Sequence, residues 1–324
     1  MLGIMKVINL KNEVFFMLES QFSYPSYSGL GEISAHVFLP EGEIRGIVQI
    51  LHGLAEHVGR YRALAEYFTA RGYLVCGNDH LGHGAGYDEK TRGYFGEKNG
   101  WEAVMQDAVT LSYRMIEEYP TLPIVYFGHS MGSFAARSIH ISGLFCPDAM
   151  ILSGTGQLPA PLVACGRAVG GVISFFKGGK RHESGVMTAL TVGGYGKAFK
   201  GEGKNAWISS IKEEVEAYES DPFCAYPVKL GLYCDMLGGI AFIIKPKAVA
   251  EAENIPILCV SGEDDPVGDM GKGVKAAYRF YAKAGFDDLS LILYPGVRHE
   301  FLHDTAKDNA LADIDAWLSE HILL

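Results

Sequence analysis

The 324-residue sequence lacks any hydrophobic run of the ~18–20 residues that a membrane-spanning helix needs. Its apolar start, residues 1–18, is interrupted by Lys6, Asn9 and Glu13 and has no small-residue cleavage site, which argues against a signal peptide. We therefore expect a cytoplasmic protein whose contact with a membrane is at most peripheral. Residues 1–16 fit a loosely held extension, with Met17 as an alternative start.

Positive charge is also scarce. The chain has 28 Lys and Arg against 38 Asp and Glu, a net charge of −10, which argues against nucleic acid as a partner because phosphate binding needs a basic face. No two of the six cysteines are spaced like a zinc knuckle, and Cys76 and Cys259 fall inside apolar strand-like runs. We therefore expect reduced, structural cysteines. The sequence does not indicate an oligomeric state.

Short apolar runs alternate with helical patterns along most of the chain. This alternation predicts an α/β protein with a mostly parallel sheet covered on both faces. The rhythm stops after the apolar run 149–153 and resumes at the run 255–261, with a last helix expected over about 301–322. The predicted units are an N-terminal extension (1–20), a core (21–156 and 246–324) and an inserted cap or lid (157–245).

A G-x-S-x-G motif follows an apolar run and precedes a helix-like run. It reads Gly128-His129-Ser130-Met131-Gly132. In this context the serine is expected on a sharp strand-to-helix turn, with nearly side-chain-free residues two positions to either side. The turn would aim the backbone N–H of Met131 at the place where negative charge develops. Ser130 is thus a candidate nucleophile.

A serine nucleophile needs a base and an acid that orients the base, here expected after later strands. The acidic loop Glu263-Asp264-Asp265-Pro266 follows the run 255–261. We favour Asp265, which Pro266 holds in an extended conformation, with Asp264 and then Glu263 as alternatives. His299 follows the last predicted strand and is favoured as the base. His303, one turn further on, is the alternative.

The second oxyanion donor is expected after the apolar run 45–51, where the chain reads His52-Gly53-Leu54. Gly53 permits the sharp turn that would direct the Leu54 N–H toward Ser130. Each such donor typically contributes ~3–4 kcal/mol to transition-state stabilisation.

These segments resemble the monoacylglycerol lipase and lysophospholipase branch of the α/β hydrolases, the serine-aminopeptidase-like group. The segments that show the resemblance are residues 52–61, 79–84, 128–132, 262–267 and 296–299. The resemblance implies an α/β-hydrolase fold with a mostly parallel eight-stranded sheet, helices on both faces and an inserted cap. It also implies a Ser130–Asp265–His299 triad, with the amides of Leu54 and Met131 as the oxyanion hole.

The resemblance further places three side chains near a polar leaving-group pocket, namely Glu56, Arg60 and His129. The family usually has glycine where this chain has Ala55. The expected reaction is hydrolysis of monoacylglycerol, lysophospholipid or short- to medium-chain acyl esters through an acyl-serine, with no cofactor. The small glycine-rich cap motivates the short to medium chain length, and its apolar stretch 168–176 is expected to line an acyl tunnel, with packing and then membrane contact as alternatives.

Other interpretations remain open. The Asp79-His80-x-x-His83 motif, or His52 with His57, could suggest a metal site, but a catalytic metal needs three convergent ligands, and we expect a structural loop and no metal. An aminopeptidase, thioesterase or carbon–carbon hydrolase could use the same triad. A peptidase would need an acidic anchor in the cap, for which Glu213, Glu214 and Glu216 are candidates. A non-catalytic ligand-binding module is the remote alternative.

Overall fold

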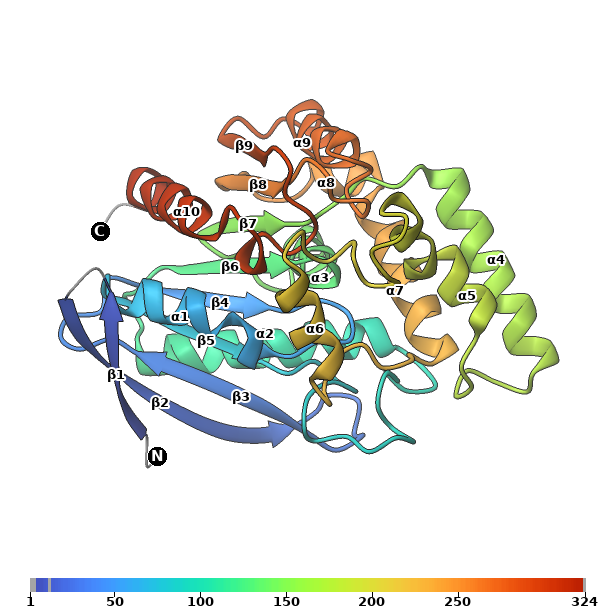
Figure 1. Cartoon of the computed structure of the whole chain (residues 1–324), viewed down its shortest axis with the longest axis horizontal. Helices are drawn as coiled ribbons and strands as arrows, with labels where there is room; N and C mark the ends of the chain where they lie inside the picture. The colour runs from blue at the N-terminus through green and yellow to red at the C-terminus, as the bar shows by residue number, and fades with distance from the viewer. Residues whose placement is uncertain (1–3, 11–12, 323–324) are drawn as a thin grey trace.

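The computed structural model describes residues 4–10 and 13–322, with side chains described from residue 17 onward. This part of the chain contains a nine-stranded sheet in the order β1-β2-β3-β5-β4-β6-β7-β8-β9 (Figure 1). The strands are β1 (Ile4–Leu10), β2 (Glu13–Pro25), β3 (Glu32–Leu39), β4 (Gly46–Leu51), β5 (Tyr73–Asn78), β6 (Ile124–His129), β7 (Ala149–Ser153), β8 (Ile257–Gly262) and β9 (Leu289–Tyr294). Strands β4 to β9 are parallel, whereas β1, β2 and β3 pair antiparallel. The predicted fold class is confirmed.

The sheet has one strand more than the eight expected. Strands β1 and β2 form a hairpin, and β2 pairs with β3 from Leu18 to Pro25. The side chain of Met17 is fully buried. Within the segment expected to be loosely held, residues 4–10 instead pair with β2 and form the outermost strand of the sheet. Residues 1–3 and 11–12 of the predicted extension, and 323–324 of the predicted core, lie outside the described residues.

Helices cover both faces of the sheet because the central strands are apolar on both sides. Along β4, Ile47 and Leu51 join one hydrophobic cluster, whereas Val48 and Ile50 join the other. The helices α2 (Gly100–Glu118), α3 (Met131–Ile141) and α9 (Lys272–Ala284) contribute to the first cluster. The helices α1 (Arg62–Thr69) and α10 (Lys307–His321) contribute to the second. The sheet is therefore buried between two layers of helices. Because its central strands are parallel, the loops that follow them meet at one edge of the sheet.

The stretch between β7 and β8 is fully described and adds no strand to the sheet. It contains α4 (Ala160–Phe176), α5 (Gly185–Leu190), the 3₁₀ helix η2 (Val192–Ala198), α6 (Lys212–Ser220), α7 (Leu230–Ile243) and α8 (Pro246–Ala250). Figure 1 shows α4, α5 and α7 together at one end of the sheet. Its boundaries as a separate cap stay a prediction.

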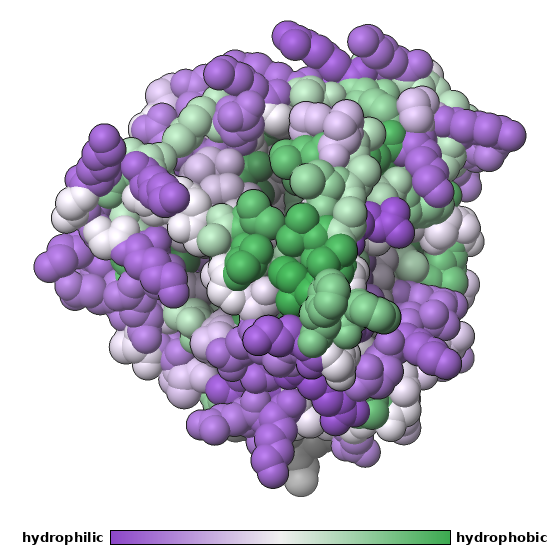
Figure 2. Space-filling view, turned by 90° about the vertical axis from the view of Figure 1, so that its right-hand side faces the viewer, coloured by the Kyte–Doolittle hydropathy of each residue, from purple (hydrophilic) through white to green (hydrophobic). Residues whose placement is uncertain are grey.

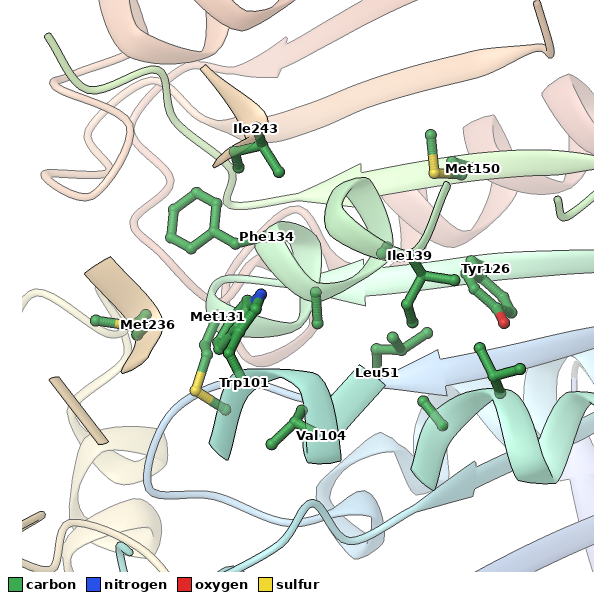
Figure 3. Packing of buried hydrophobic residues seen from close by; sticks show 14 of the residues in the cluster. Leu51, Trp101, Val104, Tyr126, Met131, Phe134, Ile139, Met150, Met236 and Ile243 are labelled. Atoms are coloured by element: carbon green, nitrogen blue, oxygen red, sulfur yellow. The ribbon is translucent and has the colours of Figure 1, made fainter. Parts of the chain in front are cut away.

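Helix α7 joins this stretch to the core. Figure 3 shows Met236 of α7 in the same cluster as Trp101 of α2 and Phe134 of α3. A Cβ added at Gly239 would overlap the indole ring of Trp101, so glycine allows α2 and α7 to approach closely. This contact connects the stretch between β7 and β8 to helices α2 and α3, which pack on the sheet.

The last predicted helix is divided in two. The 3₁₀ helix η3 (Phe301–His303) precedes α10, and Asp304 between them has an extended backbone. The Asp304 carboxylate accepts hydrogen bonds from the backbone N–H groups of Arg298, Ser210 and Thr305. These bonds favour a break that helical periodicity alone did not predict. Among the described residues, no helix is both long and apolar enough to cross a membrane.

Candidate active site

Ser130 lies on a tight turn between β6 and α3. Its backbone has φ 52° and ψ −119°, a conformation that costs a non-glycine residue energy and is typical of a serine elbow. The Ser130 N–H donates to the carbonyl oxygen of Ser153 at 2.9 Å, which anchors the turn to β7. An added Cβ at Gly128 would lie 2.7 Å from the Gly132 carbonyl oxygen, and one at Gly132 would overlap the carbonyl of Leu51. Both glycines are therefore sterically required.

Asp265 and His299 meet beside this elbow, although 34 positions separate them. Nδ1 of His299 lies 3.0 Å from Oδ1 of Asp265, and their side chains are 3% and 0% exposed. Asp265 is fixed by the Ser261 hydroxyl at 3.1 Å and by the Val267 N–H at 2.8 Å. Its loop neighbours face elsewhere, since Glu263 is half-buried and Asp264 is exposed. Of the three carboxylates, the structure brings only Asp265 to the imidazole.

The alternative base, His303, has other partners. Its Nδ1 lies 3.0 Å from Oε2 of Glu214, and its Nε2 lies 3.2 Å from the Arg60 carbonyl oxygen. Both ring nitrogens are thus engaged away from Ser130 and Asp265. The structure assigns His303 to the contact between η3 and α6.

The imidazole of His299 lies close to two other aromatic rings. The His129 ring centroid is 4.6 Å away and that of Trp207 is 5.0 Å away. The backbone N–H of His299 also donates to the Trp207 carbonyl oxygen at 3.3 Å. Burial alone would lower the pKa of His299, but the negative charge of Asp265 raises it above its ordinary value. Sequence analysis did not predict the Trp207 contact, because nothing in the local pattern joins a residue of the insertion to the loop after β9.

The loop after β4 passes directly over the elbow. A Cβ added at Gly53 would lie 3.3 Å from Cβ of Ser130. Ala55, where the family usually has glycine, has φ 54°, which explains that preference. In the part of the chain that the structure describes, the amides of Leu54 and Met131 donate no hydrogen bond to another protein group. Both are therefore available to a bound group.

A cavity of about 1080 Å³ joins these residues. Ser130, His299, Leu54 and Met131 line one region of it, together with Gly53. The walls are largely apolar and include Phe134, Leu158, Leu162, Met187, Leu190, Val192, Met236, Leu237 and Ile240. The volume lies at the upper end of the range for small-molecule sites.

The predicted acyl-tunnel role of residues 168–176 is wrong. None of them lines the cavity, and the neighbouring Leu162, Cys165 and Gly166 of α4 do. Val169 and Ile173 pack against the core, while Phe175 and Phe176 are 81% and 79% exposed. A helix turns through 360° every 3.6 residues, so a uniformly apolar stretch cannot place all its side chains on one face.

A buried charged cluster supports the loop after β4. Arg60 donates two hydrogen bonds of 2.7 Å to Glu300 and one of 3.1 Å to Glu56. Glu56 in turn accepts from the Gly53 N–H and, at 2.8 Å, from the Tyr61 hydroxyl. Burial alone would raise the pKa of Glu300, but Arg60 lowers it to about 2. Sequence analysis predicted no role for Glu300, which completes this cluster.

The three residues proposed for a leaving-group pocket differ in position. Glu56 and His129 line the cavity, as does Glu300. Arg60 is not part of the lining, and its guanidinium instead lies over the Tyr218 ring, 4.9 Å from the centroid. His129 Nδ1 lies 2.9 Å from the Ser153 hydroxyl. This arrangement suits Arg60 to holding Glu56 and Glu300 in place.

The two histidines of the glycine-rich loop after β5, His80 and His83, are buried beside His52 of the loop after β4. The backbone N–H of His80 donates to Nε2 of His52 at 2.9 Å, and the two ring centroids lie 4.1 Å apart. Burial lowers the pKa of His80 to about 3 and that of His83 to about 4, so both stay neutral. Their buried contacts are those of a structural loop.

Comparisons with known proteins agree with this geometry. The family model described as serine aminopeptidase, S33, matches residues 42–306. A monoacylglycerol lipase of Mycolicibacterium smegmatis is 28% identical over 311 residues, covering 94% of this chain and all of that protein. A monoglyceride lipase of Rattus norvegicus is 25% identical and covers 87% of this chain and 85% of its own length.

Solved structures give the same result. A thermostable carboxyl esterase of Bacillus coagulans, in complex with glycerol, superposes with a TM-score of 0.87 at 29% identity. The alignment covers 94% of this chain and 99% of that one. A lipase in its open form has a TM-score of 0.85 at 25% identity, covering 94% and 100%. The chain therefore belongs to the serine aminopeptidase (S33) family of α/β hydrolases, as its motifs predicted.

Proposed function

We propose that this chain is a carboxylic ester hydrolase that cleaves monoacylglycerols and related single-chain esters through an acyl-Ser130 intermediate. The observation that carries the proposal is the convergence, in one cavity, of a strained serine, a buried His–Asp pair and two unpaired amides. The names of the similar lipases and esterases support the ester class.

In the proposed mechanism, His299 removes the Ser130 proton as the serine oxygen attacks the ester carbonyl. The amides of Leu54 and Met131 donate to the resulting oxyanion. Asp265 holds the imidazole through Nδ1, so that Nε2 is the nitrogen that accepts the proton, and it stabilises the imidazolium. His299 then protonates the departing alcohol and activates the water that releases the acid.

The substrate class follows from the two sides of the cavity. The apolar walls suit a single acyl chain, whereas Glu56, His129 and Glu300 offer polar groups to a small alcohol. Sequence analysis expected short to medium acyl chains because the cap is small. The volume of about 1080 Å³ favours extending that range to longer single chains.

The peptidase alternative receives no support from its candidate anchors. Glu214 is paired with His303 and Glu216 with Lys212 at 3.1 Å. Neither these two nor Glu213 lines the cavity. Hydrolysis of thioesters or of carbon–carbon bonds would use the same triad, so only measured turnover of each substrate class distinguishes these activities from ester hydrolysis.

The testing experiment is a hydrolysis panel. It compares p-nitrophenyl esters from acetyl to palmitoyl, monoacylglycerols, lysophospholipids and aminoacyl-naphthylamides, with Ser130→Ala as the blank. We expect turnover of the esters and monoacylglycerols, abolished in the blank. Faster turnover of aminoacyl-naphthylamides than of every ester would contradict the proposal.

We further propose that substrate is taken from lipid aggregates by peripheral contact. Figure 2 shows apolar side chains gathered on the end of the molecule where α4 and α5 lie. The exposed apolar residues of these helices are Leu162, Val172, Phe175, Phe176, Val186 and Leu190. Two of them, Leu162 and Leu190, also line the cavity, so the exposed face leads into it. Exposed apolar patches of this kind commonly mark interaction sites.

A further inference from the structure

Three side chains of types that can bind a metal ion, from two distant segments, meet at the loop that carries Leu54. His57 belongs to that loop, Asp221 follows α6, and Cys224 lies in the next turn. Their donor atoms all lie within 4.8 Å of one another, and Nε2 of His57 is 3.0 Å from Oδ2 of Asp221. Asp221 and Cys224 are 164 and 167 positions from His57, so sequence analysis, which expected no metal, had no pattern from which to predict the cluster.

Cys224 is the buried member of this cluster, and it packs with Ile208 and Tyr218. Its side chain is buried, and among the described residues its sulfur has no hydrogen-bond partner. A buried thiol without a hydrogen-bond partner, beside an imidazole and a carboxylate, is an arrangement that a borderline-soft cation can use.

We propose that His57, Asp221 and Cys224 form a zinc site, with Nε2, Oδ2 and Sγ as ligands and water in the fourth position. Tetrahedral zinc takes these three ligand types at ~2.0–2.3 Å, which requires donors roughly 3.3–3.8 Å apart. The present donors lie within 4.8 Å of one another, so zinc binding requires the side chains to rotate toward the ion. Binding breaks the S–H bond, releases the proton to solvent and forms a zinc–thiolate bond.

The charges around the site are compatible with a bound dication. Zinc with one thiolate, one carboxylate and a neutral imidazole has a net charge of zero. Arg60 is the cation that acts on both Asp221 and Cys224. Its charge is already offset by Glu56 and Glu300. Zinc binding would therefore replace one existing ion pair, that between His57 and Asp221.

The site would join the insertion to the core. The Ala225 N–H donates to the Ala55 carbonyl oxygen at 3.2 Å, and the Tyr218 hydroxyl donates to the same oxygen at 3.3 Å. Zinc would add a third and stronger link between these segments, and would stabilise the folded state without taking part in hydrolysis. The inference is therefore independent of the proposed catalytic function.

The test uses full-length protein stripped of metal with a chelator and kept reduced, then titrated with zinc or cobalt. We expect one zinc per chain and a melting temperature that rises by about 4 °C at a zinc concentration 100-fold above Kd. Cobalt should give thiolate-to-metal charge-transfer absorption. Cys224→Ser should lose both effects, whereas Cys146→Ser, which changes an exposed cysteine that is not part of the cluster, should keep both.

His57→Gln provides a second variant in case Cys224→Ser fails to fold, and it should also lose the zinc-dependent rise. His299→Ala separates this site from the catalytic histidine and should retain full binding. The inference is overturned if the wild type binds no zinc, if the cobalt charge-transfer band persists in Cys224→Ser, or if binding disappears in His299→Ala.

Discussion

Oδ1 of Asp265 lies 3.0 Å from Nδ1 of His299, and both side chains are almost completely excluded from solvent. Because a neutral amide cannot hold the required tautomer or stabilise the imidazolium, Asp265→Asn should lower kcat by about 10⁴-fold. Steady-state hydrolysis of a soluble p-nitrophenyl ester measures this effect.

Asp264→Asn is the matched control, since it makes the same chemical change one position away on an exposed side chain. We expect its kcat to stay within a few-fold of wild type. A large loss in Asp264→Asn with near-normal activity in Asp265→Asn would show that the orienting acid has been assigned to the wrong residue.

The pH dependence of hydrolysis should follow the titration of His299. The base must be neutral to act, and Asp265 raises the pKa of His299 above its ordinary 6.5. Activity is therefore present above that raised pKa and is lost as the pH falls through it. A profile of kcat/KM against pH for a neutral ester should show an acidic inflection above 6.5.

The residual activity of Asp265→Asn supplies an internal check on this assignment. Without the carboxylate, burial dominates and the inflection should move to lower pH. An inflection at the same pH in both proteins would mean that another group controls the profile.

The buried cluster around Arg60 should matter for stability. Arg60→Met leaves two carboxylates, Glu56 and Glu300, buried without their shared cation. Breaking a buried pair in this way costs about 3–5 kcal/mol of unfolding free energy. Equilibrium denaturation in urea or guanidinium chloride measures the loss.

Arg62→Ala is the comparison, because Arg62 is 38% exposed and pairs with Glu19 near the surface. Surface ion pairs contribute about 0–1 kcal/mol, so only a small change is expected. Equal losses in the two variants would argue that Arg60 acts through packing alone.

The exposed aromatic pair at the end of α4 should affect lipid substrates selectively. Phe175 and Phe176 are exposed and do not line the cavity, so replacing both with serine should leave kcat/KM for a soluble acetyl ester unchanged. Turnover of monoacylglycerol presented in vesicles should fall several-fold, since apolar contact area with the lipid is lost. Sedimentation with vesicles measures binding directly, and unchanged binding would contradict the peripheral-contact proposal.

The sequence predicted the parts of the site that local rules control. A serine between two glycines, after a strand and before a helix, specifies the elbow at Ser130 because only that backbone fits there. Strand order likewise predicted that the loops carrying Asp265 and His299 would approach one another. These predictions depend on spacing along the chain and on the parallel sheet.

The remaining features depend on contacts between distant segments. The sequence around Trp207 does not predict that its ring centroid lies 5.0 Å from that of His299. Nor does it predict that the Trp207 carbonyl oxygen accepts a hydrogen bond from the backbone N–H of His299. Glu300 becomes part of a cluster only when η3 packs beside the loop carrying Arg60. Strand β2 pairs with β3 on one side and with β1 on the other. Backbone hydrogen bonds determine both pairings, and the amino-acid composition does not predict them.

The most direct test of the central claim is labelling by a fluorophosphonate probe, followed by peptide mass spectrometry. We predict stoichiometric labelling of Ser130, with the rate greatly reduced in His299→Ala although that variant retains its fold by circular dichroism. Labelling confined to a different residue, or no labelling of folded wild-type protein, would contradict the account.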